Sequence, residues 1–364
     1  MISKKTIAPF YERLALILIG FVVLGYLIVQ GKEILDPLMF GFLFAILLLP
    51  VANLFERRLR MPRSVSSFLC VILMVALVTA ILYMVGAQIS RLTADWPMLK
   101  NQLSQSIDDV SHWIEGRFNI NLESQKTLVD DTAKKILSSG SQVITTTFGA
   151  VSSLVLFYVF IMIFTFFILF YRRLLYQFVL RVFNNDHESI VHDIAQNIQS
   201  ILRQYILGLL FEMIIVAAIA CTAFWMIGIK YAVLLGLIVG LFNIIPYLGI
   251  FTALILSVLI TFATGPISNT VAVGVSIIVI HAVDANLLLP TVVGSKVRLN
   301  ALITFLGIIL GEMLWGLSGM FLSIPVIAIF KIIFDRIEST KPWGYLLGGD
   351  YEVKPAAKKR MKTE

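Results

Sequence analysis

Apolar residues recur along the chain in long runs separated by short polar or basic stretches. Six runs have the length of a single transmembrane helix: Leu14–Val29, Pro37–Phe55, Val65–Ile89, Phe148–Tyr171, Tyr205–Gly228 and Thr270–Val293. A helix rises about 1.5 Å per residue and a bilayer's hydrocarbon core is about 30 Å thick, so each run suits one crossing. The pattern predicts an all-α polytopic integral membrane protein. The first run is interpreted as a span rather than a cleaved leader, because no small-x-small site follows it.

Two further apolar runs are too long for one crossing. Tyr231–Phe262 is interrupted by Asn243–Gly249, and Leu299–Phe334 is interrupted by Gly311–Gly319. As a single helix, each would reach roughly 50 Å. We expect each run to fold back as a broken, re-entrant helical hairpin, an element from which many transporters build a substrate site. Counting each hairpin once, the chain has about 8 membrane segments.

Polar stretches divide the chain further. Ser90–Gln142 carries an amphipathic stripe and is expected to form a small extracytoplasmic helical subdomain. The linker Arg172–Arg203 is also amphipathic and suits the membrane surface. We expect five regions: an N-terminal three-span region (1–89), the extracytoplasmic segment (90–147), a fourth span with the cytoplasmic linker (148–203), a transport core with two broken hairpins (204–338) and a basic cytoplasmic tail (339–364).

Composition and charge place the chain in a membrane. Hydrophobic residues make up 59% of the sequence and charged residues 14%, which excludes an ordinary soluble domain. The net charge of +7 comes largely from Lys and Arg at span ends, a positive-inside pattern that needs lipid headgroups and no nucleic acid. It predicts a multi-pass membrane protein with both termini in the cytoplasm. Lys296 and Arg298 lie inside if both broken runs are hairpins, and span plus hairpin then repeats with inverted topology.

Acidic residues within apolar runs are the first candidates for chemistry. After Tyr205 these are Glu212, Asp284 and Glu312. An ionisable group at membrane depth costs several kcal/mol and usually faces a cavity or a partner. For Glu212, proton or cation binding and a structural pair with His281, Lys296 or Arg298 both remain open. His281 shares a helix face with Asp284, as a proton relay or as a hydrogen-bonded structural histidine.

The break in the first long run supplies further candidates. Asn243, Pro246, Tyr247 and Gly249 combine side-chain polar groups with backbone freed from the helix, which suits a small polar solute or a cation. A tight turn without a ligand is the alternative. Asn286, two residues after Asp284, completes the set of expected substrate- or ion-binding residues.

Catalytic signatures are missing from the sequence. It contains no His-Glu-x-x-His, no Gly-x-Ser-x-Gly and no phosphate-binding glycine loop, so we expect neither an enzyme nor an ATP-driven pump. The two cysteines, Cys70 and Cys221, fall within apolar runs and are expected to pack there. No metal site and no cofactor is predicted.

Motifs in the C-terminal half resemble the autoinducer-2 exporter (AI-2E) family of bacterial transporters. The resemblance rests on Gly240–Gly249, Asp284–Gly294, Val297–Asn300 and Gly316–Pro325, together with the order of spans. It implies export of a small polar solute resembling autoinducer-2, while other members look like sodium(lithium)/proton antiporters. Five positions depart from the usual pattern: Ile250 and Ala301 replace prolines, Asp284 a glutamate and Leu209 a glutamine, while Glu212 is an addition of this chain.

These observations predict a secondary transporter, expected to be homo-oligomeric, that exports a small polar solute. Proton coupling would suit its buried carboxylates. Sodium(lithium)/proton antiport is the alternative within transport. A membrane scaffold that binds a protein partner is the alternative from another class, although buried carboxylates and broken hairpins are a costly way to build one. The expected partners are a small polar solute, H⁺ or Na⁺, and the lipid bilayer.

Overall fold

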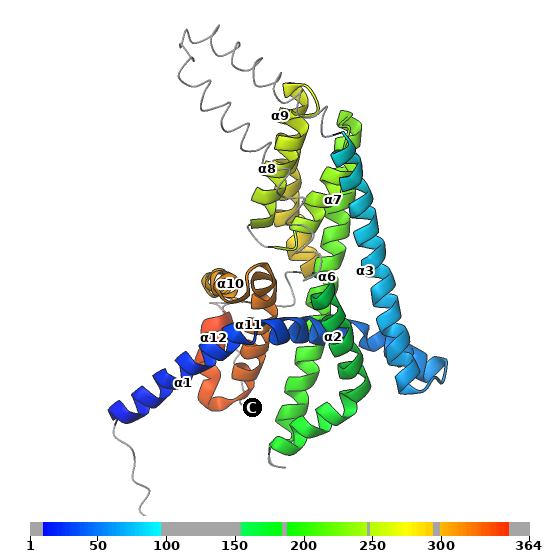
Figure 1. Ribbon diagram of the computed structural model, residues 1–364. Helices are drawn as coiled ribbons and strands as arrows, with labels where there is room; N and C mark the ends of the chain where they lie inside the picture. The colour runs from blue at the N-terminus through cyan, green and yellow to red at the C-terminus, as the bar shows by residue number, and fades with distance from the viewer. Residues whose placement is uncertain (1–9, 96–153, 184–187, 246–247, 294–298, 349–364) are drawn as a thin grey trace, which may run out of the picture. The chain divides into compact units, whose positions relative to one another are not determined.

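The computed structural model describes residues 10–95, 154–183, 188–245, 248–293 and 299–348, and these residues form helices joined by short turns (Figure 1). Seven helices in this part of the chain are long and apolar enough to span a membrane: α1 (Phe10–Gln30), α2 (Lys32–Arg58), α3 (Arg63–Ala94, with its apolar part Arg63–Leu92), the helix Leu154–Val182, α6 (Glu188–Ile227), the segment Ile267–Leu288 and α11 (Leu317–Arg336). The all-α polytopic membrane fold is therefore confirmed.

The chain divides into two compact units. The first comprises Met1–Tyr176 and Arg203–Val293, and the second comprises Gln177–Leu202 and Gly294–Glu364. The expected outer segment lies mostly outside the described residues, as do Lys296 and Arg298. The inverted repeat therefore stays a prediction.

Three helices of the first unit pack around a small apolar core. Ala52, Cys70 and Leu169, from α2, α3 and the helix Leu154–Val182, are almost completely buried in it. Cys70 is thus a packing residue, as its place in an apolar run predicts. The close approach of α2 to the helix Leu154–Val182 depends on Gly41, where an added Cβ would lie 2.7 Å from the Cβ of Phe164.

The first long run folds back on itself, as predicted. Its halves are α7 (Ala232–Phe242) and α8 (Leu248–Phe262), and α8 also packs against α9 (Ile267–Val283) (Figure 1). A Cβ at Gly249 would collide with the backbone carbonyl of Phe242. Glycine therefore lets the two halves of the hairpin meet at their break.

The second long run is also broken, but asymmetrically. α10 (Ala301–Trp315) has 15 residues and α11 has 20, and the break falls at Gly316. Gly316 has φ +70° and ψ −140°, a backbone conformation that only glycine adopts readily. Gly311 and Gly319 let the two backbones touch. The second run is thus broken where predicted, and its second half, α11, is long enough to span a membrane by itself.

The C-terminal end of the second unit is tied to its neighbours by polar contacts. α12 (Lys341–Gly348) packs on α11, and the backbone N–H of Asn300 donates to the carbonyl of Leu347 at 2.8 Å. Arg336 in α11 pairs with Asp193 in α6 at 2.5 Å.

An ion pair links the end of α3 to the turn between α6 and α7. Lys230 pairs with Asp95 at 2.8 Å, and the Tyr231 hydroxyl donates to the same carboxylate oxygen at 2.5 Å. The hydrogen bond from Lys230, followed by that from Tyr231, holds the pKa of Asp95 below its usual value.

Candidate functional site

Three polar side chains from separate helices meet in the interior of the first unit. Glu212 comes from α6, Asn243 from the C-terminal end of α7, and Asp284 from the end of α9. The Asn243 amide nitrogen donates to Glu212 Oε1 at 3.2 Å and to Asp284 Oδ2 at 3.1 Å. Glu212 is 3% exposed and Asp284 4% exposed. We call these three side chains the carboxylate–amide cluster.

Small residues bring α7 close enough to α6 for this contact. A Cβ at Gly240 would lie 2.8 Å from the carbonyl oxygen of Met213 and 2.5 Å from the Ala217 Cβ. Asn243 is one turn beyond Gly240 on α7, and Glu212 adjoins Met213 on α6. The Gly-x-x-x-Gly packing at Gly236 and Gly240 therefore sets the distance between amide and carboxylate.

Asp284 lies where the helix type changes. The α-helix α9 ends at Val283, and a π-helix, η2 (Asp284–Val293), continues the chain from Asp284. π-Helical turns are rare and occur frequently at functional sites. The expected single span over Thr270–Val293 is thus helical throughout, with a wider turn beginning at the buried carboxylate.

Each carboxylate of the cluster keeps one oxygen without a partner. Glu212 Oε2 and Asp284 Oδ1 are buried and accept no hydrogen bond in the structure. Within the described ranges, neither carboxylate forms an ion pair. Two buried carboxylates without a counter-charge are costly. Their charge is best balanced by a proton or by a bound cation.

A small cavity adjoins the cluster. It has room for about one water molecule, and its lining residues are Val216, Val239, Asn243, Ile250, Ala253, Ile277, Ile280, His281 and Asp284. Its walls are mainly apolar, and the polar groups gather at Asn243, His281 and Asp284. His281 thus lies beside the site, but it forms no ion pair with either carboxylate in the described structure.

Two other predicted site residues, Gly249 and Asn286, make contacts of their own outside the cluster. Pro246 and Tyr247 lie outside the described residues. Gly249 contacts Phe242, and the exposed amide of Asn286 donates to the carbonyl of Ala282 at 2.7 Å. Glu312 is exposed near the end of α10 in the second unit. Described residues offer no group of three or more His, Cys, Asp or Glu side chains that could hold a metal ion.

The sequence predicted each of these three residues as a site residue, but it did not predict that they contact one another. Asn243 is 31 residues from Glu212 and 41 from Asp284. No motif spacing links positions so far apart, because the packing of three helices brings them together. The one available signal was that all three are polar residues within apolar runs.

Comparison with known proteins shows a consistent relationship. The model of the family described as AI-2E family transporter matches residues 14–339. Two relatives named "Putative transport protein" match most of the chain. YueF of Bacillus subtilis is 26% identical over 298 residues, 79% of this chain and 80% of the relative. YhhT of Escherichia coli is 22% identical over 319 residues, 87% of this chain and 89% of the relative.

Proposed function

The chain belongs to the AI-2E transporter family, and from this premise we propose a secondary transporter that exchanges protons for an alkali-metal cation at the carboxylate–amide cluster. The observation that carries the proposal is the pair of buried, unpartnered oxygens, Glu212 Oε2 and Asp284 Oδ1, on either side of one amide. Sites in membrane interiors that hold ionisable groups commonly mark ion pathways and proton relays.

Protons and hard cations compete for such a site by simple chemistry. Carboxylate and amide oxygens are the ligands that hard cations prefer. A proton on Glu212 or Asp284 removes the negative charge that attracts the cation, so the two occupants displace one another. Asn243 can donate N–H to both carboxylates or, after rotation of its amide, offer Oδ1 to a cation. Alternate occupation of one site is the minimum requirement of antiport.

The broken α7–α8 hairpin supports movement of the bound ion. Asn243 lies where α7 ends, beside backbone that leaves the helix. In secondary transporters, discontinuous helices of this kind form the ion site and take part in alternating access. The proposal includes a location in the bacterial inner membrane, cytoplasmic termini and a homo-oligomer. The names of the relatives concern transport, which favours transport over catalysis or a scaffold role.

Export of a small polar solute is the second candidate. The cavity beside the cluster favours it, because polar groups of Asn243, His281 and Asp284 meet apolar walls there. The cavity has room for about one water molecule, so it would have to widen to admit a small, neutral, polyhydroxylated molecule. Protons bound at Glu212 and Asp284 would then drive the export of the solute.

Proton movement in proteoliposomes tests the proposal. A pH-sensitive dye is followed while Na⁺, Li⁺ or K⁺ is added to vesicles of the purified protein. We expect a response to Na⁺ or Li⁺ that falls at least tenfold in Asp284→Asn and acquires a different pH dependence in Glu212→Gln. Glu338→Gln is the matched control, since its carboxylate is 93% exposed and lies in the second unit.

Two results would contradict antiport. A response of normal size in Asp284→Asn would remove this carboxylate from the pathway. No response from wild-type protein with native thermal stability would exclude cation exchange, and export of polar metabolites would replace it as the leading function.

A further inference from the structure

Arginines gather where α2 ends and α3 begins, beside the helix Leu154–Val182. They are Arg57, Arg58, Arg60, Arg63 and Arg173, and we call them the arginine surface. All except the half-buried Arg63 are exposed. Within the described part of the chain, none of the five forms an ion pair. A cluster of five uncompensated positive charges needs an anionic partner or full hydration.

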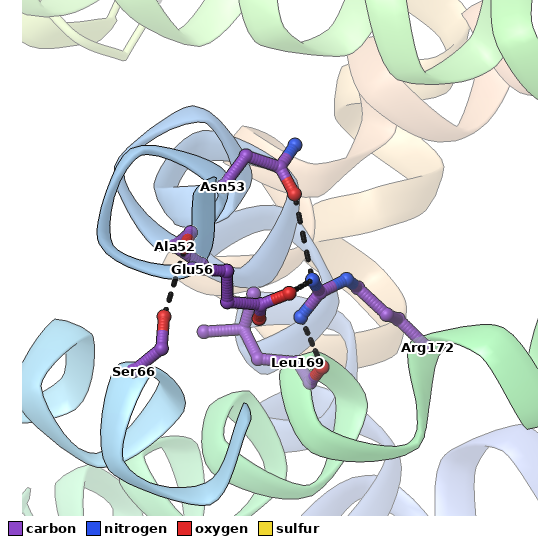
Figure 2. Close-up of polar contacts among 6 residues, drawn as sticks. All are labelled: Ala52, Asn53, Glu56, Ser66, Leu169 and Arg172. Atoms are coloured by element: carbon purple, nitrogen blue, oxygen red, sulfur yellow. Dashed lines mark hydrogen bonds and ion pairs between the residues drawn. The ribbon is translucent and has the colours of Figure 1, made fainter. Parts of the chain in front are cut away.

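A sixth arginine links the C-terminal part of α2 to the helix Leu154–Val182. Figure 2 shows Arg172 donating to Glu56 Oε2 at 2.6 Å, to Asn53 Oδ1 at 3.4 Å and to the carbonyl of Leu169 at 3.0 Å. The Ser66 hydroxyl donates to the carbonyl of Ala52 at 2.9 Å and ties the start of α3 to α2. Glu56 is thus engaged by Arg172, so it does not neutralise the arginine surface.

The arginine surface coincides with the end of the apolar part of each helix. The apolar run of α2 ends at Phe55, that of α3 begins at Val65, and that of the helix Leu154–Val182 ends at Tyr171. Residues immediately beyond an apolar span lie at the height of the lipid headgroups. Arginine is well suited to that depth, because its planar guanidinium binds phosphate oxygens in pairs.

The backbone at Arg60 supplies an independent observation. Arg60 has φ +53°, the only left-handed residue other than glycine in the described structure. The turn around it is closed by the Met61 N–H, which donates to the carbonyl of Phe55 at 3.2 Å. Glycine adopts this conformation at lower cost and is the usual choice after a helix. The arginine at this position places a guanidinium in the turn between α2 and α3, at a backbone cost that glycine would avoid.

We propose that the arginine surface binds the phosphate groups of anionic phospholipids in the cytoplasmic leaflet. The occupant is a lipid rather than a soluble phosphate, because the charges lie where the apolar parts of three helices end and next to lipid-facing side chains. Phe68 in α3 and Leu54 in α2, for example, are 57% and 49% exposed. A headgroup bound there has its acyl chains beside these apolar residues. The site is separate from the carboxylate–amide cluster and does not depend on the ion that is transported.

Native mass spectrometry of the full-length protein in a neutral detergent, titrated with phosphatidylglycerol, tests this site. An anionic lipid gains about 1 kcal/mol per basic residue near the surface, which is about fivefold in affinity. We expect Arg60→Gly to weaken retention of phosphatidylglycerol about fivefold, and Arg57→Ala with Arg58→Ala to weaken it further. Arg60→Lys should retain most of the binding. Arg91→Ala is the control, since Arg91 is exposed at the other end of α3.

The melting temperature separates lipid binding from folding. Arg60→Gly relieves the left-handed backbone, so without lipid its melting temperature should equal or exceed that of the wild type. With phosphatidylglycerol present, the wild type should gain more than the variant. Unchanged lipid retention in Arg60→Gly would overturn the proposal. Equal stabilisation by inorganic polyphosphate and by phosphatidylglycerol would also overturn it, since the occupant would then be a soluble polyanion.

Discussion

Asn243 is the residue on which the candidate site depends, because it contacts both buried carboxylates at once. A primary amide has two N–H donors pointing in different directions, so one side chain serves Glu212 and Asp284 together. Serine or threonine has one donor and would leave one carboxylate without a partner. The amide also supplies an oxygen that a bare cation can use. These properties explain why an asparagine suits this position.

Replacement of this amide should cost both stability and transport. In Asn243→Leu, two buried carboxylates lose their donor, and an unsatisfied buried polar group costs about 1–3 kcal/mol. We expect a lower melting temperature in detergent and loss of the cation-dependent proton signal. Asn197→Leu is a suitable control, because in the described structure its amide bonds to Asp193, one turn away in the second unit. An Asn243→Leu protein with normal stability and transport would show that the contact is incidental.

At the scale of elements, glycines decide how closely helices approach. Gly236 and Gly240 set α7 against α6, Gly249 lets α8 meet α7, and Gly311 with Gly319 joins α10 to α11. In a membrane, helices associate through close van der Waals packing rather than through exclusion of water, so small residues matter more there. Both hairpins therefore owe their closure to positions without a side chain.

One methyl group should open the first hairpin. Gly249→Ala places a Cβ against the Phe242 carbonyl, and overpacking of this kind costs about 1–3 kcal/mol. Gly20→Ala in α1 has nothing within 4 Å and should be neutral or slightly stabilising. Thermal unfolding of the two variants in one detergent compares them directly. If both melt alike, the α7–α8 contact does not limit stability.

The contact between Asp95 and Lys230 gives an element-scale prediction for pH. Because the pKa of Asp95 is lowered in the folded protein, the contact stabilises fully above the ordinary aspartate pKa of about 4 and is lost as pH falls further. Wild type should therefore melt at a slightly higher temperature than Asp95→Asn. This difference in melting temperature should be the same at pH 7 and at pH 5. The difference should vanish only in stronger acid and shrink in high salt. A difference that disappears between pH 7 and pH 5 would contradict this assignment.

At the scale of the whole molecule, charge distribution predicts orientation. The positive-inside rule places the turn near Lys32 outside and the helix α12 inside. We expect Lys32→Cys to react with an impermeant thiol reagent on intact cells. Lys341→Cys should react only after the membrane is permeabilised. Both lysines are exposed, so access across the membrane rather than burial decides the result. The opposite labelling pattern would reverse the topology.

The sequence by itself determined the class of the protein. Apolar runs of fixed length require helices in a membrane, because unpaired backbone groups cannot be left in hydrocarbon. The same reasoning located the breaks near Asn243 and Gly316, since neither long run fits one crossing. Motifs identified the family, and the rule that charge is costly at membrane depth selected Glu212 and Asp284.

Only the tertiary structure decided which of these residues act together. It brought Asn243 between Glu212 and Asp284, left Asn286 and Glu312 exposed, and made the second hairpin unequal. It also revealed Arg60 in a left-handed conformation at the α2–α3 turn. The physical reason is that the length of an apolar run determines which segments enter the membrane. Contacts between segments 30 or 40 residues apart depend instead on how glycines and small side chains let particular helices meet.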